Sequence, residues 1–460
     1  MIRDKMEKKM TTMIAAIAVV AVVLIAGAAV ILNDSKESSS DAAIASKLQI
    51  RGNANDDHTI DSKDMDILED VIAGTKTLAD YPLTDVNGDG AVNDTDKALL
   101  KDLIDRKEGS AVYVLCLDRG GNSTTVKATY PLRNVVTFGA NMQMPALYAN
   151  GGQYVAGYFK SEYTTAEASI SSAATDLKGA ARTISDAAWT NFTNLDDKIG
   201  GIGALLVDYS AIAQITDLRM SDLDDADIPM ICYESADATA EITTVLTLSF
   251  LFGKECESVG VDYAQTAWNV IEQVNSKVST KTAAEKQKYI CCTMFIYLCG
   301  IDSSFNTTAA TAGGIPYASV NEEYAKTYTK NSTKMSSIEA MANFTDADIV
   351  INNRSMDWGL DADGIKALII ETWDHSNKGT SSTVYFAKFL DKLVYINNLL
   401  PGAVKVAYMA HAMYGDDFSR EWADGVLQNY IDMGTLPLKG QTLDTILAYF
   451  DQSDYNKAIA

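Results

Sequence analysis

The sequence contains few histidines and few basic residues. Only three histidines occur among 460 residues, His58, His375 and His411, and they lie far apart. Direct capture of Zn²⁺ or Mn²⁺ needs clustered His and carboxylate ligands, so this scarcity argues against such a site. Lys and Arg number 38 against 61 Asp and Glu, giving a formal net charge of −23. Nucleic-acid binding needs a basic surface, so we expect no nucleic-acid partner.

Cysteine motifs and catalytic motifs are also missing. The six cysteines form no C-x-x-C pair, and several sit inside apolar runs such as YICCTMFIYLC. We interpret them as small buried hydrophobic residues, with one or two disulfides as the alternative. No Ser-His-Asp order, phosphate-binding glycine loop, H-E-x-x-H helix or catalytic carboxylate pair stands out. We therefore expect a protein that is not an enzyme.

The amino-terminal residues 1–32 are typical of a membrane anchor. Basic residues at 3, 5, 8 and 9 precede an uncharged apolar run from Met13 to Leu32. A run of about 20 residues crosses ~30 Å of hydrocarbon as a helix. Positive charge before the run and none directly after it places the rest outside the cytoplasm. We expect a cell-membrane protein, single-pass, with extracytoplasmic carboxy-terminal domains, and residues 33–47 as a linker. The alternative is a signal segment cleaved near Ala26-Gly27-Ala28.

A calcium-binding pattern occurs twice between residues 48 and 108. The second loop, 85–96, has oxygen-bearing side chains at positions 1, 3, 5, 9 and 12 and Gly90 at position 6. Ca²⁺ takes six to eight oxygen ligands, and this spacing supplies them together with the carbonyl of position 7. The expected ligands are Asp85, Asn87, Asp89, the carbonyl of Ala91, Asn93 and Asp96.

The first loop, 53–64, repeats the spacing with two departures. Its expected calcium ligands are Asn53, Asn55, Asp57, the carbonyl of Thr59, Asp61 and Asp64. His58 replaces the glycine at position 6, and Asn53 is neutral at position 1. An internal repeat of the same ligand spacing is nevertheless more specific than either loop alone.

Two loop–helix repeats that end in Asp rather than Glu resemble a type I dockerin. The resemblance covers residues 48–108, called the dockerin-like module below. It implies a small all-α domain that binds calcium and docks onto a cohesin-like domain. In that family positions 10 and 11 of each loop help to choose the partner. Here these positions are Ser62-Lys63 in the first loop and Asp94-Thr95 in the second, so the two loops differ from each other. Cohesin binding therefore rests on the resemblance alone.

Residues 109–460 show an α/β pattern. AVYVLCLD and STTVKATY predict two strands on either side of a turn at 119–122. Further strands are predicted at VVTF (135), ALLVDY (204), PMICY (229), YICCTMFIY (289), DIVIN (348) and LVYIN (393). Helical stretches lie between them, which favours mainly parallel sheets. The stretch of about 237–280 is predicted to be one long connector helix between a first lobe, 109–236, and a second lobe, 281–460.

This region resembles the solute-binding proteins of ABC importers that capture iron-siderophores, haem or cobalamin. The segments that carry the resemblance are VLCLDRGGNSTTVKATYPLRNVVTFGA, IPMICYESADATAEITTVLTLSFLFGKECES, SSIEAMANFTDADIVINN and AYMAHAMYGDDFSREWADGVLQNYID. A dockerin-like pair ahead of such a domain also resembles an architecture of archaeal surface proteins. The resemblance implies two α/β lobes joined by a helix, a ligand in the cleft, and an ABC permease as partner. Glu339 matches the second-lobe glutamate that docks the permease, whereas the first-lobe position falls near Gln214, which is not acidic.

The residues that follow the predicted strands are the expected ligand-binding residues. Ligands of open α/β sheets bind beyond the carboxyl ends of strands. These residues are Asn141, Tyr209, Tyr233, Arg354 and Trp358. A metal chelate or tetrapyrrole needs aromatic faces and a few fixed charges. For the tyrosines the alternative is a place in the core or at the rim.

The predicted fold class is α/β: two α/β lobes joined by a long connector helix, preceded by the small all-α dockerin-like module and an amino-terminal transmembrane helix. The predicted function is the extracytoplasmic substrate-binding component of an ABC importer for an iron chelate, haem or cobalamin. The alternative is a cell-surface assembly or adhesion protein that uses the dockerin-like module for a cohesin-type interaction.

Overall fold

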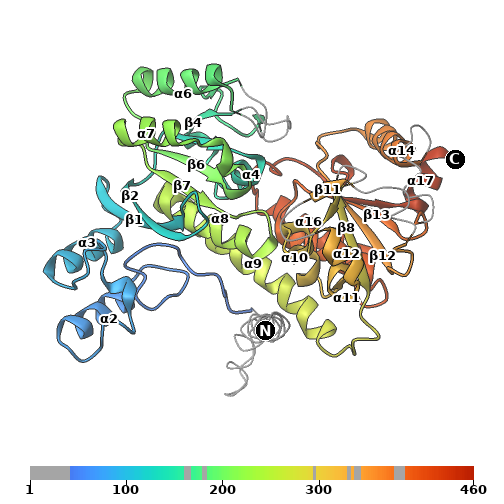
Figure 1. Cartoon of the computed structure of the whole chain (residues 1–460), viewed down its shortest axis with the longest axis horizontal. Helices are drawn as coiled ribbons and strands as arrows, with labels where there is room; N and C mark the ends of the chain where they lie inside the picture. The colour runs from blue at the N-terminus through green and yellow to red at the C-terminus, as the bar shows by residue number, and fades with distance from the viewer. Residues whose placement is uncertain are drawn as a thin grey trace, which may run out of the picture. The chain divides into compact units, whose positions relative to one another are not determined.

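Figure 1 shows a computed structural model of the chain. The structure describes residues 42–159, 167–178, 184–293, 297–328, 333–335, 343–377 and 389–460. The predicted anchor, most of the predicted linker and Glu339 lie outside these ranges. Within them, no helix combines the length and the apolar character that a membrane span requires.

The dockerin-like module contains the two helices that its repeat predicts. They are α2 (Ser62–Ile72) and α3 (Asp94–Ile104), with a short 3₁₀ helix, η1 (Pro82–Thr84), between them. Each helix begins at a capping box, formed by Asp61 with Asp64 and by Asn93 with Asp96. Side chains at positions 9 and 12 of each loop therefore also satisfy the free N–H groups that start the following helix.

A β-hairpin follows the module. The strands β1 (Ser110–Leu117) and β2 (Ser123–Tyr130) pair antiparallel from Ser110 opposite Tyr130 to Leu117 opposite Ser123. This confirms the predicted pair of strands. Ile50 bridges to Val114, so the chain entering the module also pairs with the hairpin.

The first lobe is built on a parallel sheet with strand order β5-β4-β3-β6-β7. Its strands are β3 (Val135–Phe138), β4 (Val155–Tyr158), β5 (Thr175–Asp176), β6 (Ala204–Asp208) and β7 (Met230–Tyr233). Its helices are α4 (Ala140–Tyr148), α6 (Asp186–Ile199) and α7 (Asp217–Asp225), with 3₁₀ helices η2 (Gly152–Tyr154) and η3 (Tyr209–Gln214). Every residue of β3, β6 and β7 is buried, as expected for parallel strands covered on both faces.

The second lobe has the strand order β11-β9-β8-β12-β13-β14, and β10 also pairs with β8. Its strands are β8 (Lys288–Thr293), β9 (Tyr297–Cys299), β10 (Ile315–Pro316), β11 (Thr333–Met335), β12 (Ile349–Arg354), β13 (Leu393–Asn397) and β14 (Tyr449–Asp451). Its helices are α10 (Ser304–Thr311), α11 (Tyr317–Val320), α12 (Glu322–Thr327), α14 (Ala362–Asn377), α15 (Gly402–Met413), α16 (Arg420–Asp432), α17 (Gln452–Ile459) and the 3₁₀ helix η5 (Leu443–Thr445). The apolar run at 289, predicted as one strand, contributes to two strands, β8 and β9, that pair antiparallel.

The prediction of a single connector helix is wrong. Two helices occupy that stretch, α8 (Ala238–Phe252) and α9 (Lys254–Val278), and Gly253 separates them with φ 110° and ψ 173°. They pack side by side, with Gly260 of α9 against Ser249 of α8. In Figure 1, α9 runs from beside the hairpin toward the second lobe. The 25 residues of α9 span about 37 Å, and α9 leads from α8 to β8, the first strand of the second lobe.

Candidate functional site

Loops that follow β3, β6 and β7 meet at one edge of the first-lobe sheet. Gly139 lies after β3 with φ 90°, and a Cβ there would stand 3.1 Å from Cβ of Asp208. Asp208, at the end of β6, accepts from the backbone N of Ser210 at 3.0 Å and the hydroxyl of Ser235 at 3.4 Å. Burial raises the pKa of Asp208, while hydrogen bonds from Ser210 and Asn141 oppose that rise. Asp208 therefore fixes the three loops relative to one another.

Asp208 was missed by the sequence analysis. It is the last residue of ALLVD, an acidic side chain directly after an apolar run. Asp208 is 1% exposed. Its carboxylate therefore contacts the loops from their buried side and is nearly inaccessible to a ligand. A buried carboxylate at a strand end is the signal that points to such a role.

Asn141 lies where the two lobes meet. A narrow pocket there is lined by α4 and the β7–α8 loop of the first lobe, and by the β13–α15 loop of the second. Its lining residues are Asn141, Met144, Pro145, Tyr148, Ser235, Ala236, Glu241, Asn398, Leu399, Leu400 and Lys405. Its free volume is about 10 Å³, roughly enough for one water molecule. The deep end of the crevice is therefore filled by side chains in this conformation.

A buried ion pair lies beside this pocket. Oε2 of Glu241 is 3.7 Å from Nζ of Lys405, and the two side chains are 5% and 6% exposed. Oε1 of Glu241 accepts from the hydroxyl of Tyr263 and from the backbone N of Gly402, each at 2.5 Å. Burial raises the pKa of Glu241, and Lys405, Tyr263 and Gly402 favour its charged form. These contacts join α8 and α9 to the start of α15.

A second direct link joins the lobes at the same place. The hydroxyl of Tyr148, on α4, donates to the carbonyl of Leu399 at 2.5 Å. The ring of Tyr148 also stacks on Tyr263, with centroids 5.5 Å apart. Tyr148 and Tyr263 thus pack together beside Glu241 at the inter-lobe pocket.

Arg354 is next to this crevice on the second-lobe side. It ends β12, is half-buried, and its carbonyl accepts from the backbone N of Asn398 at 2.9 Å. Asn398 lines the pocket together with Asn141. The structure therefore brings Asn141 and the strand end of Arg354 to the same inter-lobe edge.

The three predicted aromatic residues lie elsewhere. Trp358 and Tyr233 are each 8% exposed and belong to the main apolar core. Tyr209 begins η3, and a Cβ on Gly121 would stand 2.4 Å from its hydroxyl, so it packs against the β1–β2 turn. None of the three lines the narrow pocket.

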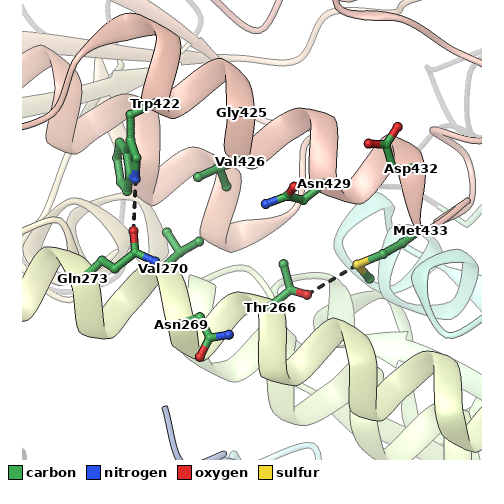
Figure 2. A pocket seen from close by; sticks show the side chains of 10 residues that line it. All are labelled: Thr266, Asn269, Val270, Gln273, Trp422, Gly425, Val426, Asn429, Asp432 and Met433. Carbon is green, nitrogen blue, oxygen red and sulfur yellow. Dashed lines mark hydrogen bonds between the residues drawn. The ribbon is translucent and has the colours of Figure 1, made fainter. Parts of the chain in front are cut away.

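A larger groove, about 800 Å³, lies between α9 and α16 (Figure 2). It is lined by Thr266, Asn269, Val270, Gln273, Trp422, Gly425, Val426, Asn429, Asp432 and Met433. Nε1 of Trp422 donates to Oε1 of Gln273 at 3.1 Å across it. All of its lining residues come from helices or a helix end, so among the described residues no strand end opens into it.

The second loop, 85–96, turns at two glycines and is closed by hydrogen bonds to its acidic side chains. Gly88 and Gly90 adopt positive φ of 73° and 89°. The two oxygens of Asp85 accept from the backbone N of Asp89 at 3.1 Å and of Gly90 at 3.0 Å. The carboxylate of Asp96, fully buried, accepts from the backbone N of Val86 at 2.8 Å. The side chains at the first and last positions of the loop therefore both hold its backbone.

The first loop follows the same course but departs at the two positions already noted. Asp64 accepts from the backbone N of Asn55 at 3.1 Å and of Asp61 at 2.8 Å. His58 has no positive φ, and the side-chain amide of Asn53 donates to the carbonyl of Asp57 at 2.7 Å. Burial, together with the carboxylates of Asp57 and Asp61, raises the pKa of Asp64 to about 6.

The donor set of both loops fits calcium. In the parts of the chain given above, no three His, Cys, Asp or Glu side chains gather closely enough to hold a metal by themselves. Bound Ca²⁺ would therefore depend on the Asn side chains and backbone carbonyls as well, which are ordinary calcium ligands. Asp64 is buried, and the carboxylates of Asp57 and Asp61 repel its negative charge. A bound cation would offset that repulsion.

Comparisons with known proteins found similar solved structures but no match in sequence. No family model matches the chain, and no curated protein matches it in sequence. The TroA-like periplasmic binding protein FepB from Veillonella parvula has 15% identity and a TM-score of 0.50, over 73% of this chain and 99% of that one. The nickel–histidine complex of Helicobacter pylori CeuE has 10% identity and a TM-score of 0.49, over 70% and 95% of the two chains. Molybdate-bound MolA from Haemophilus influenzae has 11% and 0.48, over 69% and 97%.

Identities this low show the fold alone. The likeness to the Veillonella structure shows that this chain contains the two-lobed α/β fold of a TroA-like periplasmic binding protein.

Proposed function

We propose that residues 109–460 are the extracytoplasmic substrate-binding component of an ABC importer. The observation that carries this proposal is the edge where both lobes present the carboxyl ends of parallel strands, with Asn141 on one side and Arg354 on the other. Ligands of α/β sheets bind at such edges. The fold is shared with a TroA-like periplasmic binding protein, which favours capture of a small ligand between the lobes.

The proposed ligand is a metal chelate or tetrapyrrole: an iron chelate, haem or cobalamin. Arg354 supplies a guanidinium that keeps its charge and pairs a ligand carboxylate through two hydrogen bonds. A pocket for such a ligand has about 300–1,000 Å³, far more than the roughly 10 Å³ now free. Binding therefore requires the lobes to separate at this edge, or the ligand to lie outside the narrow pocket.

Native mass spectrometry tests the transport proposal. The protein is purified from its own membranes and its intact mass is compared with the mass after denaturation. We expect a mass excess that is lost on denaturation and that matches a metal-containing small molecule. A preparation that carries no ligand and gains none from haem, cobalamin or ferric siderophores would contradict the proposal.

We further propose that the dockerin-like module binds Ca²⁺ at loop 85–96 and at loop 53–64. The donor sets described above support both sites, and the positive-φ glycines favour the second loop. Calorimetry of the whole chain should show two sites, with Asp85→Ala removing one and Asp64→Ala the other. Asp66→Ala is the matched control, since Asp66 is an exposed acid on α2. Absence of binding heat in the unsubstituted protein would refute calcium binding.

The proposal also includes a membrane anchor over residues 1–32. Its partner is proposed to be an ABC permease, docked through Glu339. Fractionation should place the protein with membranes, with its bulk open to external protease. Recovery of the protein in the cytosol would contradict the proposed location.

A second candidate function is a cohesin-type interaction. The partner-choosing positions Ser62, Lys63, Asp94 and Thr95 are all exposed, which favours it. Calcium-dependent binding to an immobilised cohesin domain tests this candidate. It fails if Lys63→Ala and Asp94→Ala together leave that binding unchanged.

A further inference from the structure

Each calcium loop is tied to the rest of the molecule by one arginine. Nη1 of Arg51 donates to the carbonyl of Asp85, the first residue of loop 85–96, at 2.7 Å. The same guanidinium is 3.6 Å from the Asp85 carboxylate, and its Nε donates to Oγ1 of Thr125 on β2 at 3.3 Å. The backbone N of Arg51 donates to the carbonyl of Tyr113 on β1 at 2.9 Å. Arg51 thus joins the second loop to both strands of the hairpin.

Arg106 makes the equivalent link for the first loop. Its guanidinium donates to the carbonyl of Ile60, position 8 of loop 53–64, at 3.2 Å. It also forms a two-bond fork on Glu257 of α9, at 2.6 Å and 2.9 Å. The side chains of Arg106 and Glu257 are 17% and 23% exposed, and the guanidinium lies over the ring of Phe250, 4.8 Å from its centroid. A bidentate pair shielded from water in this way is among the stronger ionic contacts in proteins.

The dockerin-like module also shares its apolar core with the first lobe and the connector. Its buried core residues are Leu48, Ile50, Ile60, Leu68, Val86, Leu100 and Leu103. They belong to the same apolar cluster as Val112 and Val114 of β1 and Phe250 and Leu251 of α8. Only the five residues 105–109 separate the module's last helix from the hairpin, because α3 ends at Ile104 and β1 begins at Ser110.

The segment before the module is also hydrogen-bonded to the connector helix α9. The backbone N of Ala42 donates to Oδ1 of Asn269 at 2.7 Å, and Nε1 of Trp268 donates to Oγ of Ser46 at 3.1 Å. Both partners are on α9. The module is therefore held at its entry, at its loops and at its exit.

We propose that calcium in these loops stabilises the β1–β2 hairpin and the first turns of α9, through Arg51 and Arg106, so that the module is a structural clasp on the binding domain. This inference rests on the proposed calcium binding. The acceptors used by the two arginines, the carbonyls of Asp85 and Ile60, belong to the loops themselves. A cation that fixes the conformation of the loops therefore also fixes these two carbonyl groups. The arginines bound to the carbonyls are then held in place, and with them their contacts to β2 and α9.

Thermodynamic reciprocity makes the proposal measurable. If calcium strengthens the contact between Arg106 and Glu257, then removing that contact must weaken calcium binding by the same factor. Coupling between sites is typically about 5-fold to 150-fold, so we expect Glu257→Gln to weaken calcium binding at least about fivefold.

Hydrogen exchange followed by mass spectrometry on the whole chain, with and without Ca²⁺, tests the clasp directly. We expect calcium to slow exchange at least about fivefold in peptides that cover 110–130 and 254–263, as well as in the loops. In Glu257→Gln, the protection of 254–263 should be lost while that of the loops persists. Glu69→Gln is the matched control, because Glu69 pairs with Lys97 inside the module, at 2.5 Å. It should leave the protection of α9 unchanged.

The outcomes separate the two claims. If calorimetry detects no calcium binding, the proposed calcium function fails and the clasp fails with it. If calcium binds and protects only residues 48–108, the clasp is refuted and calcium binding stands. If Glu257→Gln keeps the protection of α9 at the unsubstituted level, the link through Arg106 is refuted.

Discussion

Glu241 and Lys405 place two charges where the lobes meet and where water is nearly excluded. Removing such charges from water is costly, and their mutual attraction offsets that cost only with further hydrogen bonds. Here Glu241 receives those bonds from Tyr263 and from the backbone N of Gly402, at the positive end of the α15 dipole. The pair therefore specifies how α8, α9 and α15 fit together.

Removing one partner should be worse than removing both charges. Lys405→Met leaves a buried carboxylate unpaired, and we expect it to lower the free energy of unfolding by about 3–5 kcal/mol. Glu241→Gln combined with Lys405→Met should cost clearly less than Lys405→Met alone. Urea unfolding followed by circular dichroism measures both. With Glu241→Gln alone measured as well, a double variant as unstable as the sum of the two single variants would show that the two charges do not interact.

Arg354, the last residue of β12, and Trp358, in the loop after it, should respond differently to truncation. Trp358 lies in the core, so Trp358→Ala should cost about 3–5 kcal/mol and lower the melting temperature. Arg354 is half-buried at the strand end, so Arg354→Ala should change stability much less. Thermal melting compares them. A Trp358→Ala protein that melts like the unsubstituted one would mean that the indole is not part of the core.

Sequence alone could not separate these two residues. Both stand just after DIVIN, and the apolar run predicts the strand, although β12 continues two residues further, to Arg354. Which loop side chains turn inward depends on packing against elements distant in sequence, and no local pattern encodes that. The same holds for Tyr209, whose contact with Gly121 joins two loops far apart along the chain.

At the scale of elements, α8 and α9 show that a helical sequence pattern does not determine where a helix breaks. One glycine inside a helix costs only about 1 kcal/mol, so the pattern across Gly253 predicts continuation. The observed φ of 110° with ψ of 173° is nearly restricted to glycine, and it lets α8 lie back along α9. By contrast, VVTF, ALLVD and DIVIN are predictable because strands buried on both faces read as continuous apolar runs.

The close packing of these helices depends on Gly260. A Cβ there would stand 1.7 Å from Oγ and 2.6 Å from Cβ of Ser249, so Gly260→Ala must force the helices apart. We expect a loss of about 1–3 kcal/mol from overpacking. Gly425→Ala in α16 is the control, because a Cβ there meets nothing within 4 Å and helix propensity favours alanine. If both variants unfold at the same urea concentration, the close approach of α8 and α9 is not tight.

At the scale of the whole molecule, the described residues from 42 onward form a single compact unit. The two lobes and their strand-end edge were predictable from alternating strands and helices. How the dockerin-like module packs was not, because the contacts of Arg51 and Arg106 join residues that no local pattern relates. If the proposed ligand enters the nearly filled pocket, one lobe must move relative to the other, with α9 as the connection.

The central claim is that a metal chelate or tetrapyrrole binds at the edge marked by Arg354. Titration of the whole chain with haem, cobalamin and ferric siderophores, followed by quenching of intrinsic tryptophan fluorescence, tests it most directly. We expect saturable quenching by at least one of these ligands, weakened roughly 30-fold or more in Arg354→Ala, as for loss of a fully used charge pair. Arg119→Ala, which removes an arginine from the β1–β2 turn, should bind like the unsubstituted protein. Absence of binding by a folded protein, or equal affinity in Arg354→Ala, would contradict the account.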